Sequence, residues 1–326
     1  MNAPRAGASS RFAIIDAARG AALAAMFTYH LTWDLGYFGL IDRDVPMNRG
    51  FQLYGHVIAS SFLALVGASL VLAARNGLRW GPYGRRLAMV GAAAASVTAA
   101  TWYGFPESYI FFGILHMIAV ASIMALPFLN APLWLTSAVA VAVFAAPFVA
   151  AAPMFDQPLW QWSGLGLDQP NSNDWRPVFP WLAFTLAGVV AMRAALAHGL
   201  PQTIANWTPG GAATRALAWS GRHSLLVYLV HQPVFLAILF VATQLTRAPV
   251  DPQEAPFRSQ CETQCTGSGG DALLCARLCG CMVKELRSAD LWKIVVTRAL
   301  TPAEREKVDG LTRICARNAA DAQPQP

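Results

Sequence analysis

Lysine and cysteine are absent from the first 250 residues, and only eight acidic side chains occur there. Over the whole chain 13% of the residues are charged and 55% are hydrophobic, whereas a soluble globular protein has roughly a quarter of its residues charged. A nucleic-acid-binding protein typically has a basic stripe with interleaved aromatic residues. The fourteen arginines of this part lie instead between apolar stretches. The composition therefore argues against a nucleic-acid partner and predicts a chain embedded in a lipid bilayer.

Seven apolar stretches are long enough to cross a bilayer, which takes roughly 20 helical residues. Each is bounded by charged residues, proline or glycine. They are residues 12–35, 53–74, 86–104, 108–128, 133–151, 178–197 and 224–246. The predicted fold class is all-α, with a polytopic membrane bundle of about seven transmembrane helices over residues 1–250 and a polar segment over 251–326.

The arginines near the ends of these stretches predict the orientation, because Lys and Arg accumulate in cytoplasmic loops. A cytoplasmic N-terminus leaves four arginines outside, namely Arg43, Arg49, Arg176 and Arg247. It places ten inside, namely Arg5, Arg11, Arg19, Arg75, Arg79, Arg85, Arg86, Arg193, Arg215 and Arg222. An odd number of spans then puts the C-terminal segment in the periplasm, with the bundle in a bacterial inner membrane.

All six cysteines lie in the polar C-terminal segment, which contains no histidine. An even number confined to one short segment is typical of disulfides in an oxidising compartment such as the periplasm. Two CxxxC pairs predict a helical hairpin that turns at 266–270, because residues i and i+4 share a helix face. Of fifteen possible pairings, the hairpin favours Cys261–Cys279, Cys265–Cys275 and Cys281–Cys315. A zinc cluster is the alternative, although CxxxC is not a usual zinc spacing.

Thr301 and Glu304 form a capping-box pattern around Pro302. A Ser or Thr followed three residues later by Glu is typical of a helix N-terminus, and proline is favoured at the first helical position. The pattern predicts that a last short helix begins at Pro302.

Ionisable side chains inside a predicted span are costly to bury in lipid, so they raise a functional hypothesis. They are Asp16, Arg19, His30, Asp34, His116 and His231, with His56 near a span end. His30 and Asp34 lie one helical turn apart, the spacing at which a carboxylate can orient an imidazole. At about 1.5 Å per residue, His30, Asp34, His56 and His116 belong toward the periplasm and His231 to the inner half.

Each of these residues also has a structural explanation. His116 and His231 would then make helix–helix hydrogen bonds, and His56 would simply lie at the membrane interface. Asp16 and Arg19 would neutralise one another on one helix face.

The first span carries an Arg…Asp…Arg-Gly…His pattern, formed by Arg11, Asp16, Arg19, Gly20 and His30. Further characteristic segments are MFTYHLTWDL at 26–35, FLALVG at 62–67, FGILHMIA at 112–119, DWRPVFPW at 174–181 and GRHSLLVYLVHQP at 221–233. Together they resemble the transmembrane acyltransferase superfamily, and most closely bacterial proteins with the heparan-alpha-glucosaminide N-acetyltransferase catalytic domain. The resemblance covers roughly residues 11–246 and leaves the cysteine-rich segment outside.

The resemblance implies transfer of an acetyl group from cytoplasmic acetyl-CoA to a periplasmic carbohydrate acceptor, with no metal expected. The candidate donor-binding residues are Arg19, Arg75, Arg79, Arg85, Arg86 and Arg222, because the planar guanidinium pairs well with phosphate. The positive-inside rule alone would also explain these arginines. The candidate catalytic residues are His30, Asp34, His116 and His56, and His30 would act as general base or carry the acetyl group.

Two departures from the family pattern leave alternatives open. The lysosomal member has its reactive histidine in the loop after the first helix, but residues 36–52 contain none here, so His30 or His56 would take its place. Seven spans are fewer than in the usual members, which fits a minimal catalytic unit, a homo-oligomer or a member that has lost activity. Two other functions also fit the sequence. One is a transporter whose buried His and Asp relay protons, and the other is a membrane anchor for the disulfide-bonded segment.

Overall fold

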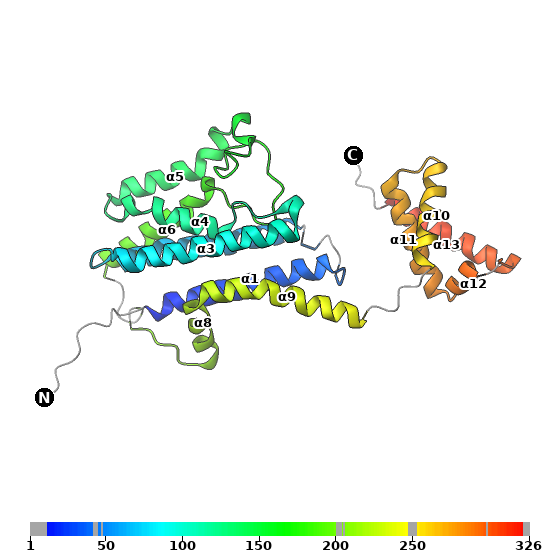
Figure 1. The fold of residues 1–326 in the computed structure, drawn as a ribbon, viewed down its shortest axis with the longest axis horizontal. Coiled ribbons are helices and arrows are strands. Elements are labelled where there is room, and N and C mark those ends of the chain that lie inside the picture. The colour runs from blue at the N-terminus through cyan, green and yellow to red at the C-terminus, as the bar shows by residue number, and fades with distance from the viewer. Residues whose placement is uncertain are drawn as a thin grey trace. The chain divides into compact units, whose positions relative to one another are not determined.

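The computed structural model describes residues 12–41, 45–46, 48–199, 204, 206–246, 253–297 and 299–321. These residues form helices, turns and loops with no strand among them, which confirms the all-α class. The chain divides into two compact units, residues 1–243 and 244–326; Figure 1 labels the helices of each. Arg5, Arg11, Arg43 and Arg247 lie outside the described residues.

Each of the seven predicted spans contains a helix. The helices are α1 (Ala13–Tyr37), α2 (Arg49–Ala74), α3 (Trp80–Gly104), α4 (Ile114–Met124), α5 (Leu133–Val149), α6 (Val178–Ala197) and α9 (Ser224–Thr246). A further helix, α8 (Ala212–Arg222), was not predicted. The helix α4 is shorter than its predicted span, because extended backbone precedes it at Gly113 and a 3-10 turn with a proline, Leu126–Leu129, follows it.

Apolar helices identify the first unit as a helical membrane protein. Among the described residues, α2, α6 and α9 are long and apolar enough to cross a membrane, while α4 and α5 are shorter apolar helices. The long helices α1 and α3 carry charged residues near their N-terminal ends. The span count of seven therefore stays a prediction.

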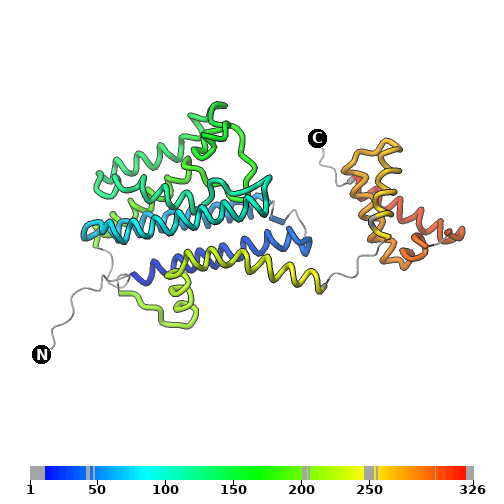
Figure 2. The backbone as a smooth tube through the Cα atoms, viewed as in Figure 1, coloured from blue at the N-terminus to red at the C-terminus, as the bar shows by residue number. Residues whose placement is uncertain are grey.

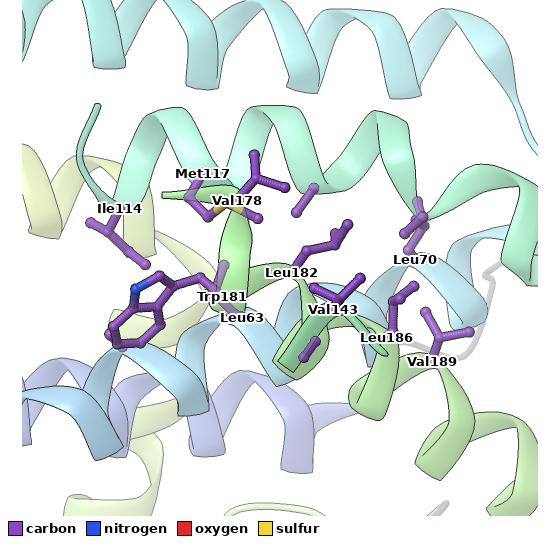
Figure 3. Close-up of a cluster of buried hydrophobic side chains, with 14 of the residues drawn as sticks. Leu63, Leu70, Ile114, Met117, Val143, Val178, Trp181, Leu182, Leu186 and Val189 are labelled. Atoms are coloured by element: carbon purple, nitrogen blue, oxygen red, sulfur yellow. The ribbon is translucent and has the colours of Figure 1, made fainter. Parts of the chain in front are cut away.

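The main core of the first unit lies between α2, α4, α5 and α6. Leu63, Met117 and Leu186 are fully buried there, and Figure 3 shows side chains from these helices pointing toward one another. The helices α2 and α6 approach until their backbones touch. A Cβ on Gly67 would lie 2.0 Å from the carbonyl oxygen of Thr185, and one on Gly188 would lie 2.0 Å from that of Ala64. Small residues of this kind allow close helix packing where no water drives association.

A second close approach joins α8 to the first turns of α1. A Cβ on Gly20 would lie 2.0 Å from the carbonyl oxygen of Leu217, and one on Gly221 would lie 1.7 Å from that of Asp16. The helix α9 begins at Ser224, directly after this contact. Its residues Val227 and Tyr228 pack against the cluster of Leu23 and Met26, so the first turn of α9 lies several residues along α1. The path of the chain through this region is continuous in the backbone trace of Figure 2.

The second unit is a helical hairpin closed by disulfides. It comprises α10 (Glu254–Gly267), α11 (Ala272–Ser288), α12 (Trp292–Thr297) and α13 (Pro302–Asp321). The three bridges are the predicted ones, Cys261–Cys279, Cys265–Cys275 and Cys281–Cys315. Buried Leu286 and Trp292 pack with the last bridge in a small apolar core.

The predicted capping box at the start of α13 is also present. The backbone N–H of Thr301 donates to Glu304 Oε2 at 2.9 Å, and the N–H of Glu304 lies 3.4 Å from Thr301 Oγ1. Two backbone donors at the helix end are thereby satisfied. The helix itself is longer than predicted, at 20 residues.

Removal of the Cys281–Cys315 bridge is expected to destabilise α13 more than removal of Cys265–Cys275. The paired cysteines are 34 and 10 residues apart, respectively, and a longer closed loop restricts the unfolded chain more, giving about 4 against about 3 kcal/mol. Hydrogen exchange of α13 amides, measured in the full-length chain, compares Cys281→Ser/Cys315→Ser with Cys265→Ser/Cys275→Ser. Equal protection in the two variants would contradict this ranking.

Candidate active site

Two short rows of side chains on α1 and α9 meet in the first unit. On α1 the row consists of Phe27, His30 and Asp34, whose spacing of three and four residues keeps them on one face. On α9 it consists of Tyr228, His231, Gln232 and Phe235. Phe27 stacks on His231 with ring centroids 5.2 Å apart, and its edge meets Phe235 at 5.7 Å. Figure 1 shows the two helices running in the same direction. We call His30, Asp34, His231 and Gln232 the α1/α9 site.

The rings of His30 and His231 lie 5.0 Å apart, centroid to centroid. Depth counting from the span ends placed His231 in the inner half and His30 further out, and the ring contact shows that this separation was wrong. The physical reason is that α9 starts several residues along α1, where Val227 and Tyr228 pack against the cluster of Leu23 and Met26. About 1.5 Å of rise per residue then brings His231 level with His30.

His231 is buried, with 6% of its surface exposed. Its Nδ1 is hydrogen-bonded to the backbone carbonyl oxygen of Tyr228. Because a carbonyl only accepts, Nδ1 carries the hydrogen, and Nε2 of the neutral ring is left as an acceptor. This Nε2 is buried and has no hydrogen-bond partner among the described residues.

Asp34 is buried, and its Oδ1 accepts a hydrogen bond of 2.7 Å from Gln232 Nε2. In the described part of the chain no hydrogen bond joins it to His30, because the carboxylate reaches across to α9 rather than back along its own helix. The structure therefore gives Asp34 a different partner from the predicted one. Its Oδ2 and the Oε1 of Gln232 are both buried without a hydrogen-bond partner among the described residues.

Arg176, in the loop before α6, carries a positive charge close to two of the predicted catalytic residues. It interacts electrostatically with both His30 and His56. Its Nε lies 3.5 Å from Asp174 Oδ1, and its guanidinium stacks on Trp181 at 4.9 Å from the ring centroid. His56 is exposed, and its ring centroid lies 5.6 Å from that of Trp181. His56 is thus connected to the α1/α9 site through Arg176.

His116 is held at the start of α4 by both ring nitrogens. The N–H of Gly113 donates to its Nδ1 at 3.2 Å, and its Nε2 lies 3.2 Å from Thr98 Oγ1. The hydroxyl of Thr98 in turn donates to the carbonyl of Ile110 at 2.6 Å. This chain of bonds favours the structural explanation of His116, whose catalytic role stays a prediction.

Asp16 and Arg19 form the predicted ion pair on α1. Arg19 Nη1 donates to Asp16 Oδ1 at 2.8 Å, and its second terminal nitrogen bonds the hydroxyl of Ser69 on α2. Arg222 Nε lies 3.9 Å from Asp16 Oδ2. Arg19 and Arg222, both proposed to bind the acetyl donor, thus lie close to the buried carboxylate of Asp16. Arg222 is half-exposed, whereas Arg19 is largely enclosed.

The other four arginines proposed for the donor lie around the start of α3. Arg79 and Arg86 line a crevice of about 180 Å³ between α2, α3 and α4. Its walls are mainly apolar, with Leu70 and Val90 among them, and the hydroxyl of Tyr83 donates to the carbonyl of Ser122 at 3.0 Å. Arg75 and Arg85 are exposed outside the crevice. Among the described residues, no group of three or more His, Cys, Asp or Glu side chains is arranged to hold a metal ion.

Three residues in or beside this site were not among the predicted catalytic residues. His231 was left open between a functional role and a helix–helix hydrogen bond, while Arg176 and Gln232 were noted only within the family segments and, for Arg176, as a topology signal. The available signal was an aromatic residue three positions before the histidine on each helix, Phe27 before His30 and Tyr228 before His231, with a polar residue following on each. Of the predicted catalytic residues, the structure brings His30 and Asp34 to the α1/α9 site, with His56 at its edge and His116 in a separate hydrogen-bonded cap.

A bundle of apolar helices with histidines, a carboxylate and an amide packed between two of them defines a helical membrane protein with a polar site between α1 and α9. Residues 11–233 match the family described as heparan-alpha-glucosaminide N-acetyltransferase, catalytic. The chain belongs to this family, as the resemblance indicated. The match runs from the start of α1 to Pro233 in α9 and does not include the cysteine-rich unit. No curated protein and no solved structure matches the chain.

Proposed function

We propose that the chain is a membrane-embedded acetyltransferase that moves an acetyl group from cytoplasmic acetyl-CoA to a periplasmic carbohydrate acceptor. Family membership supports acetyl transfer. The observation that carries the site is the contact between His30 and His231, with an unpartnered ring nitrogen buried beside a carboxylate. Ionisable groups of this kind inside a membrane bundle mark functional sites by default.

In the proposed reaction, the amine or hydroxyl of the acceptor replaces the thiolate on the acetyl carbonyl carbon. The C–S bond of the thioester breaks, a C–N or C–O bond forms, and the proton of the acceptor ends on the CoA thiol. His30 would act as a general base on the acceptor or carry the acetyl group covalently. The arginine distribution supports an N-terminus on the donor side in an inner membrane.

The crevice at the start of α3 is the proposed donor site. Its mainly apolar walls suit the thin pantetheine chain of CoA, and Arg79 and Arg86 are placed to pair with CoA phosphates. Phosphate binds guanidinium through two parallel hydrogen bonds, which are stronger than bonds between neutral groups. Arg79 and Arg86 would therefore contribute more to donor affinity than Arg75 and Arg85, which do not line the crevice.

Substitution of Arg86 by glutamine is expected to weaken acetyl-CoA binding about 10- to 100-fold, because a hydrogen bond to a charged group contributes roughly 1.5–3 kcal/mol. Arg85→Gln is the matched control, since Arg85 is adjacent on α3, has the same charge and does not line the crevice. Binding of acetyl-CoA to the purified full-length variants would be measured by calorimetry. S-acetylpantetheine, which lacks the phosphates, should bind both variants equally.

Two outcomes would contradict the donor site. Equal weakening by Arg85→Gln would show that the arginines only set the surface potential. Absence of acetyl-CoA binding to the wild-type protein at millimolar concentration would count against the enzyme altogether and would favour a transporter, which needs no acetyl donor.

A further inference from the structure

We propose that His231 accepts the proton of the acceptor nucleophile during acetyl transfer, a role that rests on the proposed function. The sequence pattern left the reactive role to His30 or His56. The structure places a second imidazole, that of His231 on α9, against His30. His231 lies two residues before the end of the family match at residue 233. What distinguishes the two rings is the hydrogen bonding of His231.

Only one atom of His231 is available for chemistry. Its Nδ1 is occupied by the Tyr228 carbonyl, three residues earlier on the same helix, which fixes both the tautomer and the ring plane. The lone pair of Nε2 is therefore the one that can take a proton. Stacking on Phe27 at 5.2 Å and the edge contact with Phe235 at 5.9 Å hold the ring from two sides. A proton acceptor needs this kind of fixed orientation before substrate arrives.

The surroundings of Nε2 indicate what binds there. Nε2 of His231, Oδ2 of Asp34 and Oε1 of Gln232 are all hydrogen-bond acceptors, and all three are buried without a partner among the described residues. A buried acceptor without a hydrogen bond costs about 1–3 kcal/mol of stability. Three such acceptors on the facing rows of α1 and α9 therefore favour a ligand that brings N–H or O–H donors. The nucleophile of an acetyl acceptor is such a group.

The step balances without any further reactant. The N–H or O–H of the acceptor donates to His231 Nε2 while its heteroatom attacks the acetyl carbonyl, and the proton moves to Nε2 as the new bond forms. When the C–S bond breaks, the leaving thiolate regains this proton, and His231 returns to its neutral tautomer. Asp34, hydrogen-bonded to Gln232 beside it, provides negative charge near the transient imidazolium.

The test compares two nucleophiles in full-length protein with acetyl-CoA as donor. D-glucosamine needs a base to lose its proton, whereas hydroxylamine is a strong nucleophile that depends on a base much less. His231→Asn is expected to lower transfer to glucosamine about 10²- to 10⁴-fold and transfer to hydroxylamine less than 10-fold, with acetyl-CoA binding unchanged. His198→Asn, at the exposed end of α6, is the matched control and should leave both rates unchanged.

The outcomes separate this inference from the function on which it rests. If the wild-type protein acetylates neither nucleophile, the proposed function fails. If it acetylates both and His231→Asn lowers the two rates equally, or lowers neither, the role of His231 fails while the function stands. Should His231→Asn not fold, the wild-type protein still decides, because proton transfer in the rate-limiting step predicts slower glucosamine acetylation in D₂O, and no slowing would overturn the proposal.

Discussion

Replacement of His30 by alanine is expected to lower acetyl transfer by at least 10²- to 10⁴-fold, the range by which a positioned acid–base or nucleophilic side chain accelerates a reaction. The ring centroid of His30 lies 5.0 Å from that of His231, with the charge of Arg176 nearby, so its loss removes the aromatic ring nearest to the proposed proton acceptor. The measurement is the formation of acetylated glucosamine from labelled acetyl-CoA by purified full-length protein.

His56→Ala is the matched control for this prediction. His56 was the other histidine proposed for the reactive role, but it is exposed and contacts Trp181 rather than His231. Its loss should reduce transfer far less, while donor binding and the thermal unfolding midpoint should stay the same in both variants. If the His30→Ala protein is active and the His56→Ala protein is inactive, the reactive role belongs to His56 instead of His30.

Substitution of Gly67 and Gly188 by alanine is expected to prevent α2 and α6 from packing. Each added Cβ would lie 2.0 Å from a backbone carbonyl oxygen of the other helix, and backbone cannot move aside as a flexible side chain can. Overpacking of a well-packed core typically costs 1–3 kcal/mol per site and occasionally more, so the double variant loses roughly 2–6 kcal/mol or more. Size-exclusion chromatography and thermal unfolding of the detergent-solubilised protein measure the loss.

Gly91→Ala on α3 provides the control, because a Cβ at Gly91 meets nothing within 4 Å. Alanine in a helix is more favourable than glycine by roughly 0.5–1 kcal/mol, so this variant should unfold at the same or a higher temperature. A Gly67→Ala/Gly188→Ala protein as stable as the wild type would contradict the close approach of α2 and α6.

Much of the fold follows from local patterns in the sequence. Long apolar stretches between charged residues, prolines and glycines predicted the positions of seven helices, and the i, i+4 spacing of Cys261, Cys265, Cys275 and Cys279 predicted the hairpin and its bridges. These features depend on neighbouring residues of one helix, which is why sequence spacing reveals them. The capping box at Thr301 is local in the same sense.

The arrangement of the site could not be predicted in this way. The depth of His231 depends on how α9 packs along α1, where Val227 and Tyr228 meet Leu23 and Met26. These residues are far apart in the chain, and their contact has no local signature. The same holds for Asp34, because a partner on its own helix and a partner on α9 are equally consistent with its position in the sequence. Arg176 was counted for topology and as part of the 174–181 segment, because nothing in its loop indicated packing against Trp181 or the histidines.

The central claim is that the α1/α9 site transfers acetyl groups across the membrane, and sealed proteoliposomes test it most directly. Labelled acetyl-CoA is supplied outside and glucosamine is enclosed inside, in vesicles where the protein has its N-terminus outward. The account predicts labelled N-acetylglucosamine in the lumen with wild-type protein and none with His30→Ala. Product that forms only when donor and acceptor share one compartment, or that forms equally with His30→Ala, would contradict it.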